Sequence, residues 1–215
     1  MDTAMTATAT IGRVGKSRAR KRADSGFSLL EVMISMAILT VGLVSLLGVF
    51  GLAMASTQTS QQNMIAAELA NEAYESIVTA RNTSQIGWDS IQNVGSYTCI
   101  NNPGGTCGIF VGSSTTPTFG PIYNSGNDGI FGTVDDQAAG EEVLREPGPG
   151  GFYGDADDIY LPLTAYQRAI QIQPVYNGTE LVTMLRSVTI TMQYTVSPSR
   201  LPQTYVLNSY ISEYQ

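Results

Sequence analysis

Residues 21–32 read Lys21-Arg22-Ala23-Asp24-Ser25-Gly26-Phe27-Ser28-Leu29-Leu30-Glu31-Val32. They join a polar, basic segment to an almost wholly apolar one that runs on to Ala55, and Glu31 is the only charged residue between Asp24 and Glu68. About 20 residues of helix are enough to cross the hydrocarbon core of a bilayer. We therefore expect a polar leader at residues 1–26 and a transmembrane helix at residues 27–55.

Charge is distributed unevenly along the chain. Six of the 11 Lys and Arg residues lie in the first 26 positions, whereas the rest of the chain holds five Arg, no Lys and 16 Asp or Glu. A basic tip before an apolar segment is the positive-inside arrangement, which predicts a cytoplasmic N-terminus and an exported, acidic body. The body has no basic patch, so we expect no nucleic-acid binding.

The composition also argues against catalysis. The 215 residues include no His, which removes the commonest general base and the commonest metal ligand. Acidic pairs of the kind that glycosidases use are common by chance. We therefore expect that the chain is not an enzyme.

The helix is expected to continue beyond the membrane, over residues 56–80. Between Ile65 and Val78 the apolar positions recur every four residues, and no Pro interrupts residues 27–81. Three glutamates line the opposite side: Glu68, Glu72 and Glu75. This is the pattern of an amphipathic helix that buries one face.

The remaining residues, 81–215, are expected to form a globular head. Residues 82–160 are rich in Gly, Asn, Ser, Thr and Pro and are expected to be irregular, with Trp88 as a core anchor. Over residues 165–215, Ser187 to Val196 alternates strictly between apolar and polar residues, and Tyr166 to Gln173 and Thr204 to Ser212 are weaker strand candidates. We predict an α+β fold in which the helix packs on a C-terminal antiparallel sheet.

Two cysteines, Cys99 and Cys107, flank a stretch of turn-forming residues. In an exported domain this spacing favours a disulfide that closes a small loop. Two unrelated free thiols are the alternative. The spacing does not fit a CxxC redox or zinc site.

The string from Lys21 to Val32 resembles the class III signal of type IV prepilins and type II secretion pseudopilins. The resemblance lies in the basic leader, the Gly26-Phe27 junction, Glu31 and the long apolar run. It implies a pilin-like fold, cleavage after Gly26 by the membrane-embedded prepilin peptidase, and N-methylation of the new N-terminus at Phe27. A conventional secretory signal would instead be cleaved after the apolar run, near Ala53 to Ala55, which is a poorer match.

The free-energy cost of placing a charge in lipid suggests a role for Glu31. An ionised carboxylate in hydrocarbon costs several kcal/mol unless it is paired. The amino group that cleavage frees on Phe27 of an adjacent subunit is the natural partner, and such a pair would set the stagger between helices. The alternative is a glutamate that extends to the membrane surface.

The resemblance also implies where the chain is stored and how it is assembled. It would be anchored in the bacterial inner membrane with a periplasmic head, extracted from lipid by the assembly platform, and packed by its helix among other pilin subunits. The residues Leu29-Leu30-Glu31-Val32 and Gly42-Leu43 look most like the corresponding residues of minor pilins of the type IV pilus modification subfamily. A minor pseudopilin in a periplasmic pseudopilus, or an anchored adhesive or calcium-binding module that does not polymerise, are the alternatives.

Between Asp128 and Asp158 nine acidic residues accompany a single base, Arg145. Two segments look alike, one ending in Asp135-Asp136 and the other in Asp157-Asp158, although no wider internal repeat is evident. Carboxylates among glycines can build the oxygen cages that Ca²⁺ prefers, although the EF-hand pattern is not met. The candidate ligands are Asp128, Asp135, Asp136, Asp155, Asp157 and Asp158; a solvated acidic loop is the alternative.

Overall fold

The computed structural model describes residues 26–95, 107–196 and 201–214. It divides into two units, residues 1–50 and residues 51–215, which are described separately. The leader predicted at residues 1–26 therefore lies outside the described residues except for Gly26.

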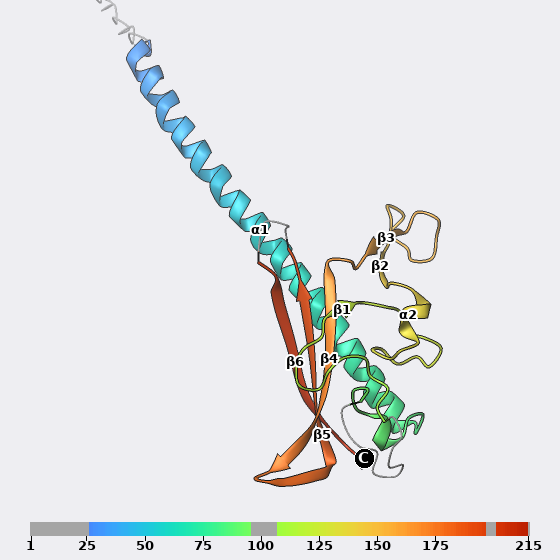
Figure 1. Cartoon of the computed structure of the whole chain (residues 1–215). Helices are drawn as coiled ribbons and strands as arrows, with labels where there is room; N and C mark the ends of the chain where they lie inside the picture. The colour runs from blue at the N-terminus through green and yellow to red at the C-terminus, as the bar shows by residue number, and fades with distance from the viewer. Residues whose placement is uncertain (1–25, 96–106, 197–200, 215) are drawn as a thin grey trace, which may run out of the picture. The chain divides into compact units, whose positions relative to one another are not determined.

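One helix, α1 (Leu29–Asn82), carries the chain from the first unit into the second (Figure 1). No Pro interrupts its 54 residues, so the backbone hydrogen-bond ladder can run without a break. Part of the ladder at its C-terminal end is satisfied by the turn that follows, where the N–H of Gln85 donates to the carbonyl of Ala80 at 2.9 Å. The prediction of one long helix is confirmed, and it ends two residues beyond the expected limit.

The second unit contains a four-stranded antiparallel sheet in the order β1-β4-β5-β6. Its strands are β1 (Gly120–Pro121), β4 (Tyr166–Asn177), β5 (Glu180–Tyr194) and β6 (Gln203–Ser212). The three long strands lie beside the C-terminal part of α1 (Figure 1). This is the pilin-like α+β arrangement that the sequence predicts.

Register in the sheet follows the sequence pattern closely. Ile170 lies opposite Ile190 in the β4–β5 pair, and Ile190 lies opposite Leu207 in the β5–β6 pair. β4 continues to Asn177, beyond the predicted Gln173, across a register shift at Pro174/Val175. The turn that follows has Gly178 at φ +65°, a conformation that glycine adopts without a Cβ clash.

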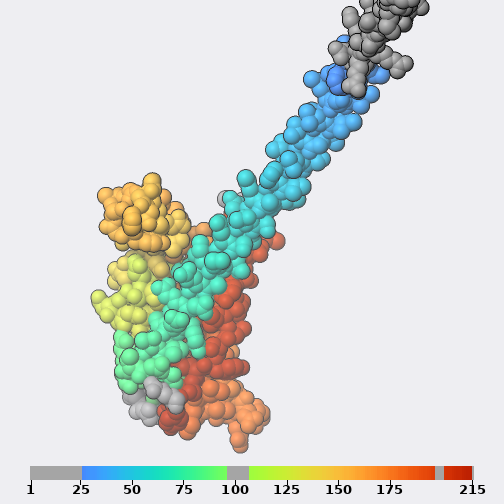
Figure 2. Space-filling view, turned by 180° about the vertical axis from the view of Figure 1, so that it is seen from behind, coloured from blue at the N-terminus to red at the C-terminus, as the bar shows by residue number. Residues whose placement is uncertain are grey.

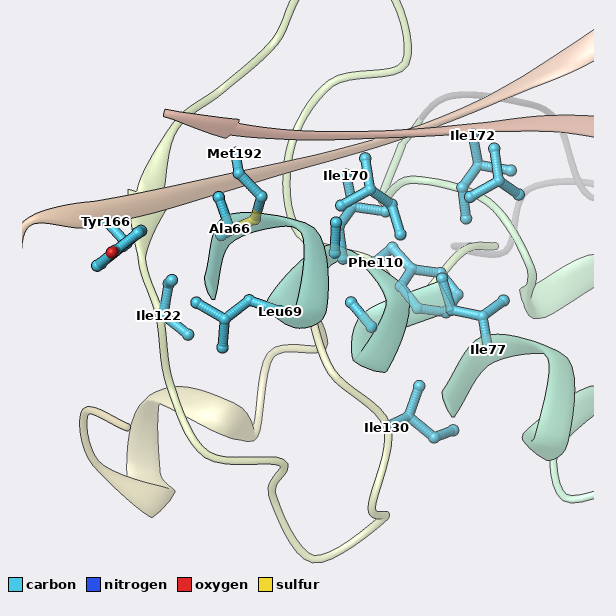
Figure 3. Packing of buried hydrophobic residues seen from close by; sticks show 14 of the residues in the cluster. Ala66, Leu69, Ile77, Phe110, Ile122, Ile130, Tyr166, Ile170, Ile172 and Met192 are labelled. Atoms are coloured by element: carbon cyan, nitrogen blue, oxygen red, sulfur yellow. The ribbon is translucent and has the colours of Figure 1, made fainter. Parts of the chain in front are cut away.

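The core of this unit forms where one stripe of α1 meets the sheet (Figure 3). Four of the six buried helical residues are alanines, and the stripe comprises Ala66, Leu69, Ala70, Ala73, Ile77 and Ala80. Short side chains let a helix approach its neighbour closely, and the sheet supplies the larger ones, among them Ile172, Ile190 and Met192. Loop residues such as Phe110 and Ile130 complete the same cluster.

The region predicted to be irregular, residues 82–160, holds several short elements. Besides β1, they are the 3₁₀ helix η1 (Trp88–Ser90), the one-turn α2 (Asp136–Ala139), and a separate two-stranded sheet of β2 (Val143–Glu146) and β3 (Ile159–Pro162). The connection between β2 and β3, with the strands themselves, forms a lobe that stands out from the rest of this unit (Figure 2). Trp88 is half-buried at the edge of the core, where its indole N–H donates to the carbonyl of Thr183 at 2.8 Å.

Candidate functional site

The N-terminal signal residues lie immediately before the helix. Gly26 and Phe27 are exposed, and the carbonyl of Ser28 accepts hydrogen bonds from the N–H groups of Glu31 at 3.0 Å and Val32 at 3.2 Å. Glu31 therefore falls in the first turn of α1. A carboxylate there interacts favourably with the unsatisfied N–H groups of the helix end.

The first part of α1 is apolar on all sides. It is long and apolar enough to cross a membrane, and none of its most apolar 18-residue window is buried. Large side chains are exposed all round this part, among them Leu39, Val41, Leu47 and Phe50. Exposing such a surface to water is unfavourable, so this segment requires lipid or other helices around it.

The few hydroxyl groups of this segment are satisfied within the helix. Ser35, Thr40 and Ser45 each donate to the backbone carbonyl four residues earlier, at 2.7, 2.7 and 2.9 Å. In hydrocarbon a polar group has no water to bond, so such internal bonds suit a membrane helix. Glu31 is then the one residue of this segment whose side chain is ionisable.

The comparisons with known proteins bear on this same segment. The model of the prokaryotic N-terminal methylation motif matches residues 21–47. This match corresponds to the class III signal of type IV prepilins and pseudopilins, so the chain carries a pilin-type N-terminus. No curated protein and no solved structure matches the chain.

The motif and the apolar helix together support a type IV pilin or pseudopilin, a structural subunit that is processed by prepilin peptidase and assembles with other subunits. They also fit a protein that is anchored in the inner membrane. Cleavage at Gly26-Phe27, methylation of Phe27 and the role of Glu31 remain predictions.

The six aspartates proposed as ligands gather in two separate groups. Asp128, Asp135 and Asp136 form the first group, and its ligand atoms lie within 4.8 Å of one another. The hydroxyl of Thr133 donates to Oδ1 of Asp135 at 2.6 Å and to Oδ1 of Asp136 at 3.1 Å. The Thr133 bond is the main reason that the pKa of Asp135 is lowered.

The second group, Asp155, Asp157 and Asp158, lies in the connection between β2 and β3 and meets the same 4.8 Å limit. Asp158 forms an ion pair with Arg145 of β2, whose guanidinium carbon also lies 5.6 Å from the ring centroid of Tyr160. The pKa of Asp155 is raised, chiefly through its hydrogen bond with Asp157. Two carboxyl groups are thus held against each other.

The two groups belong to two copies of one loop. Five residues of the first loop recur 22 positions later: Gly126, Gly129, Gly132, Asp135 and Asp136 correspond to Gly148, Gly151, Gly154, Asp157 and Asp158. The expectation of no wider internal repeat is therefore wrong, because the likeness extends from Gly126 to Asp136 in one loop and from Gly148 to Asp158 in the other.

The backbone follows the same path in both copies. φ is +70° at Gly129 and +73° at Gly151, and a hydrogen bond to the residue three positions earlier closes the turn in each, at 3.3 and 2.9 Å. The next glycine of each loop donates its N–H to the last aspartate, with Gly132 bonding Asp136 at 2.5 Å and Gly154 bonding Asp158 at 2.8 Å.

A third group of charges, which the sequence did not reveal, surrounds a buried cation. Arg168 of β4 is 7% exposed, and its guanidinium carbon lies 5.1 Å from the ring centroid of Phe131. Nη1 of Arg168 and Oε2 of Glu142 are buried without hydrogen-bond partners. Desolvation and repulsion by Glu72 raise the pKa of Glu142 to about 7, although Arg168 opposes the shift.

Cys107 is buried at 8% exposure, and its predicted partner, Cys99, lies outside the described residues. The Cys99–Cys107 disulfide therefore stays a prediction.

Proposed function

We propose that the chain is a minor pilin, a low-abundance structural subunit of a type IV pilus that enters the filament through α1. The observation that carries this proposal is the coincidence of the Gly26-Phe27 junction, Glu31 in the first helical turn, and an apolar helical segment without burial. A monomeric soluble protein has no use for such a surface, whereas a subunit stored in lipid and then packed among other helices needs it.

Glu31 supplies the chemistry of assembly. After Arg22 the next basic residue in the chain is Arg81, so no Lys or Arg of the apolar segment can neutralise the carboxylate. Cleavage after Gly26 would create an ammonium group on Phe27, only four residues from Glu31. On a neighbouring subunit this ammonium would neutralise Glu31 in a medium that strongly disfavours an unpaired charge.

Replacing Glu31 by Ala tests this proposal in the bacterium that produces the chain. We expect the variant to be cleaved to the mature length but to be missing from sheared surface filaments, because its helix has lost the group that sets its stagger. Glu180→Ala is the matched control, since it removes an exposed carboxylate at the start of β5. Filaments that contain the Glu31 variant at the wild-type level would contradict the proposal.

Two alternative functions would use the same N-terminal motif and apolar helix. A minor pseudopilin would be processed and assembled in the same way, and deleting the chain would then abolish protein secretion rather than surface filaments. An anchored module that does not polymerise would draw on the acidic loops of the head, and its membrane retention and ligand binding would be unaffected by Glu31→Ala.

A further inference from the structure

The two copies of the repeated loop differ at one chemically decisive position. Thr133 of the first loop is replaced by Asp155 in the second, 22 residues later. In the first loop the Thr133 hydroxyl donates to the carboxylates of Asp135 and Asp136. An ionised Asp155 has no proton to donate, so the second loop brings three acceptors together where the first has a donor between two.

Asp158 shows the consequence of this difference. Its side chain is 0% exposed, and its Oδ2 accepts hydrogen bonds from the N–H of Gly154 at 2.8 Å and from Nε of Arg145 at 2.5 Å. Its Oδ1 is buried and has no hydrogen-bond partner. The equivalent atom in the first loop, Oδ1 of Asp136, accepts from Thr133 and from the N–H of Gly126. Burying a carboxylate oxygen without a hydrogen-bond partner costs free energy unless a cation binds that oxygen.

Charge and spacing indicate which cation would do so. The carboxylates of Asp155, Asp157 and Asp158 carry a formal −3, and Arg145 supplies the only ion pair to them among the described residues, which leaves −2. Their ligand atoms lie within 4.8 Å of one another. Two oxygens that bind the same Ca²⁺ at about 2.4 Å each can be no more than about 4.8 Å apart.

The backbone leaves room for the carboxylates to converge. A Cβ built on Gly150 would lie 3.1 Å from Oδ2 of Asp157 and 3.2 Å from Oδ2 of Asp155. The N–H of Gly150 donates to Oδ2 of Asp157 at 2.7 Å, which fixes that carboxylate. In the first loop the corresponding residue is Asp128, and its Oδ1 is already engaged by the N–H of Ile130 at 2.8 Å.

We propose that the loop from Gly148 to Asp158 binds one Ca²⁺ through the carboxylates of Asp155, Asp157 and Asp158. The ion lies between these three carboxylates, and backbone carbonyls and water complete its coordination shell. Ca²⁺ is favoured over Mg²⁺ because it accepts irregular oxygen cages, whereas Mg²⁺ demands a near-ideal octahedron.

Calcium titration of the full-length chain in detergent micelles, after treatment with EDTA, tests the site by calorimetry and by the rise in Tm. We expect a Kd on the order of 10⁻⁴–10⁻³ M, typical of extracellular modules, and a weaker response to Mg²⁺. Terbium luminescence sensitised by nearby tyrosines, such as the exposed Tyr153, provides a local readout. A chain that binds no Ca²⁺ at 10 mM, a concentration about tenfold above that range, overturns the proposal.

Asp155→Thr is the decisive variant, because it installs the residue that the first loop uses. It should lose one bound Ca²⁺ per chain, or raise the Kd at least tenfold, while keeping the wild-type Tm in EDTA. Asp135→Asn in the first loop is the matched control and should leave this site unchanged. Unaltered stoichiometry and affinity in Asp155→Thr would refute the assignment.

Arg145→Gln provides a second test, in which the affinity for Ca²⁺ should rise rather than fall. It removes the one cation that competes for Asp158, so the affinity for Ca²⁺ should rise severalfold. A lower affinity for Ca²⁺ would show that Arg145 does not compete with the ion, and would contradict a site that includes Asp158.

Discussion

The guanidinium carbon of Arg186 lies 4.4 Å from the centroid of the Trp88 ring, and Nη1 of the same arginine donates to the backbone carbonyl of Trp88 at 2.6 Å. A second hydrogen bond from Nη1 reaches the carbonyl of Ile91. One side chain of β5 thus holds both ends of η1, the short helix that follows the turn after α1.

Replacing Arg186 by Lys should lower the free energy of unfolding by about 1–2 kcal/mol. An ammonium group keeps the charge but loses the planar group that stacks on Trp88 and donates to two carbonyls. Denaturant unfolding of the chain in detergent measures this change. Glu180→Ala, at an exposed position, is expected to stay within about 0.5 kcal/mol of wild type.

Glu142 should make the stability of the second unit depend on pH. Its pKa is raised from 4.5 to about 7 in the folded chain, so folding favours the protonated carboxyl group. Its contribution to stability is complete below about pH 4.5 and is lost as the pH rises through 7.

Glu142→Gln, which cannot ionise, should therefore match wild type below about pH 4.5 and be more stable above pH 7. We expect a gain of about 1 kcal/mol, after allowance for solvent screening of a half-buried group. Thermal unfolding at several pH values measures the difference, with Glu141→Gln as the control for the loss of one charge. A constant difference across this range would count against the raised pKa.

Ala73 should tolerate no enlargement, because it is 0% exposed in the stripe of α1 that faces the core. Ala73→Leu would force the helix away from the sheet and should cost about 1–3 kcal/mol. That corresponds to a fall in Tm of roughly 2–4 °C per kcal/mol for a unit of this size. Ala67→Leu, on the same helix but only partly buried, should change Tm much less.

Processing should leave Phe27 as the first residue of the mature chain. Mass spectrometry of filament or membrane fractions should find an N-methylated Phe27, since the motif at residues 21–47 is that of N-terminal methylation. Replacing Gly26 by a bulky residue should leave the leader attached. A mature chain that begins near residue 56 would indicate a conventional secretory signal instead.

Cys99 and Cys107 should protect each other from alkylation unless a reductant is added. Loss of the predicted disulfide by Cys107→Ser should destabilise the head by about 2–3 kcal/mol, because the crosslink restricts a short loop of the unfolded chain. Equal labelling with and without reductant would show that the two thiols are free.

The sequence could predict the long helix and the sheet because both depend on local periodicity. Val188, Ile190 and Met192 alternate with polar residues in β5, and all three are buried. Thr191, on the polar face of the same strand, is also buried at 8% exposure, which the alternation alone does not predict. On the neighbouring strand, Gln171 is also 8% exposed and donates to the carbonyl of Ser114, a loop residue, at 3.4 Å.

The charges around Arg168 could not be predicted because they meet only in the folded chain. Glu72 comes from α1, Asp136 from α2 and Glu142 from the residue before β2, and each interacts electrostatically with Arg168 of β4. The repeated loop was hidden for another reason. Five residues match, all of them Gly or Asp, and only the shared φ angles and hydrogen bonds show that the copies fold alike.

The alanine-rich stripe has a mechanical consequence for a chain that is pulled by its N-terminus. The backbone of α1 runs unbroken from Leu29 to Asn82, and six of its last 17 residues are buried in the core of the second unit. Because the hydrogen-bonded backbone of α1 is continuous, a force applied to its first turns would reach the part of the chain that carries those side chains. The head would resist extraction until the sheet released them together, so its unfolding strength would set the load that each subunit can bear.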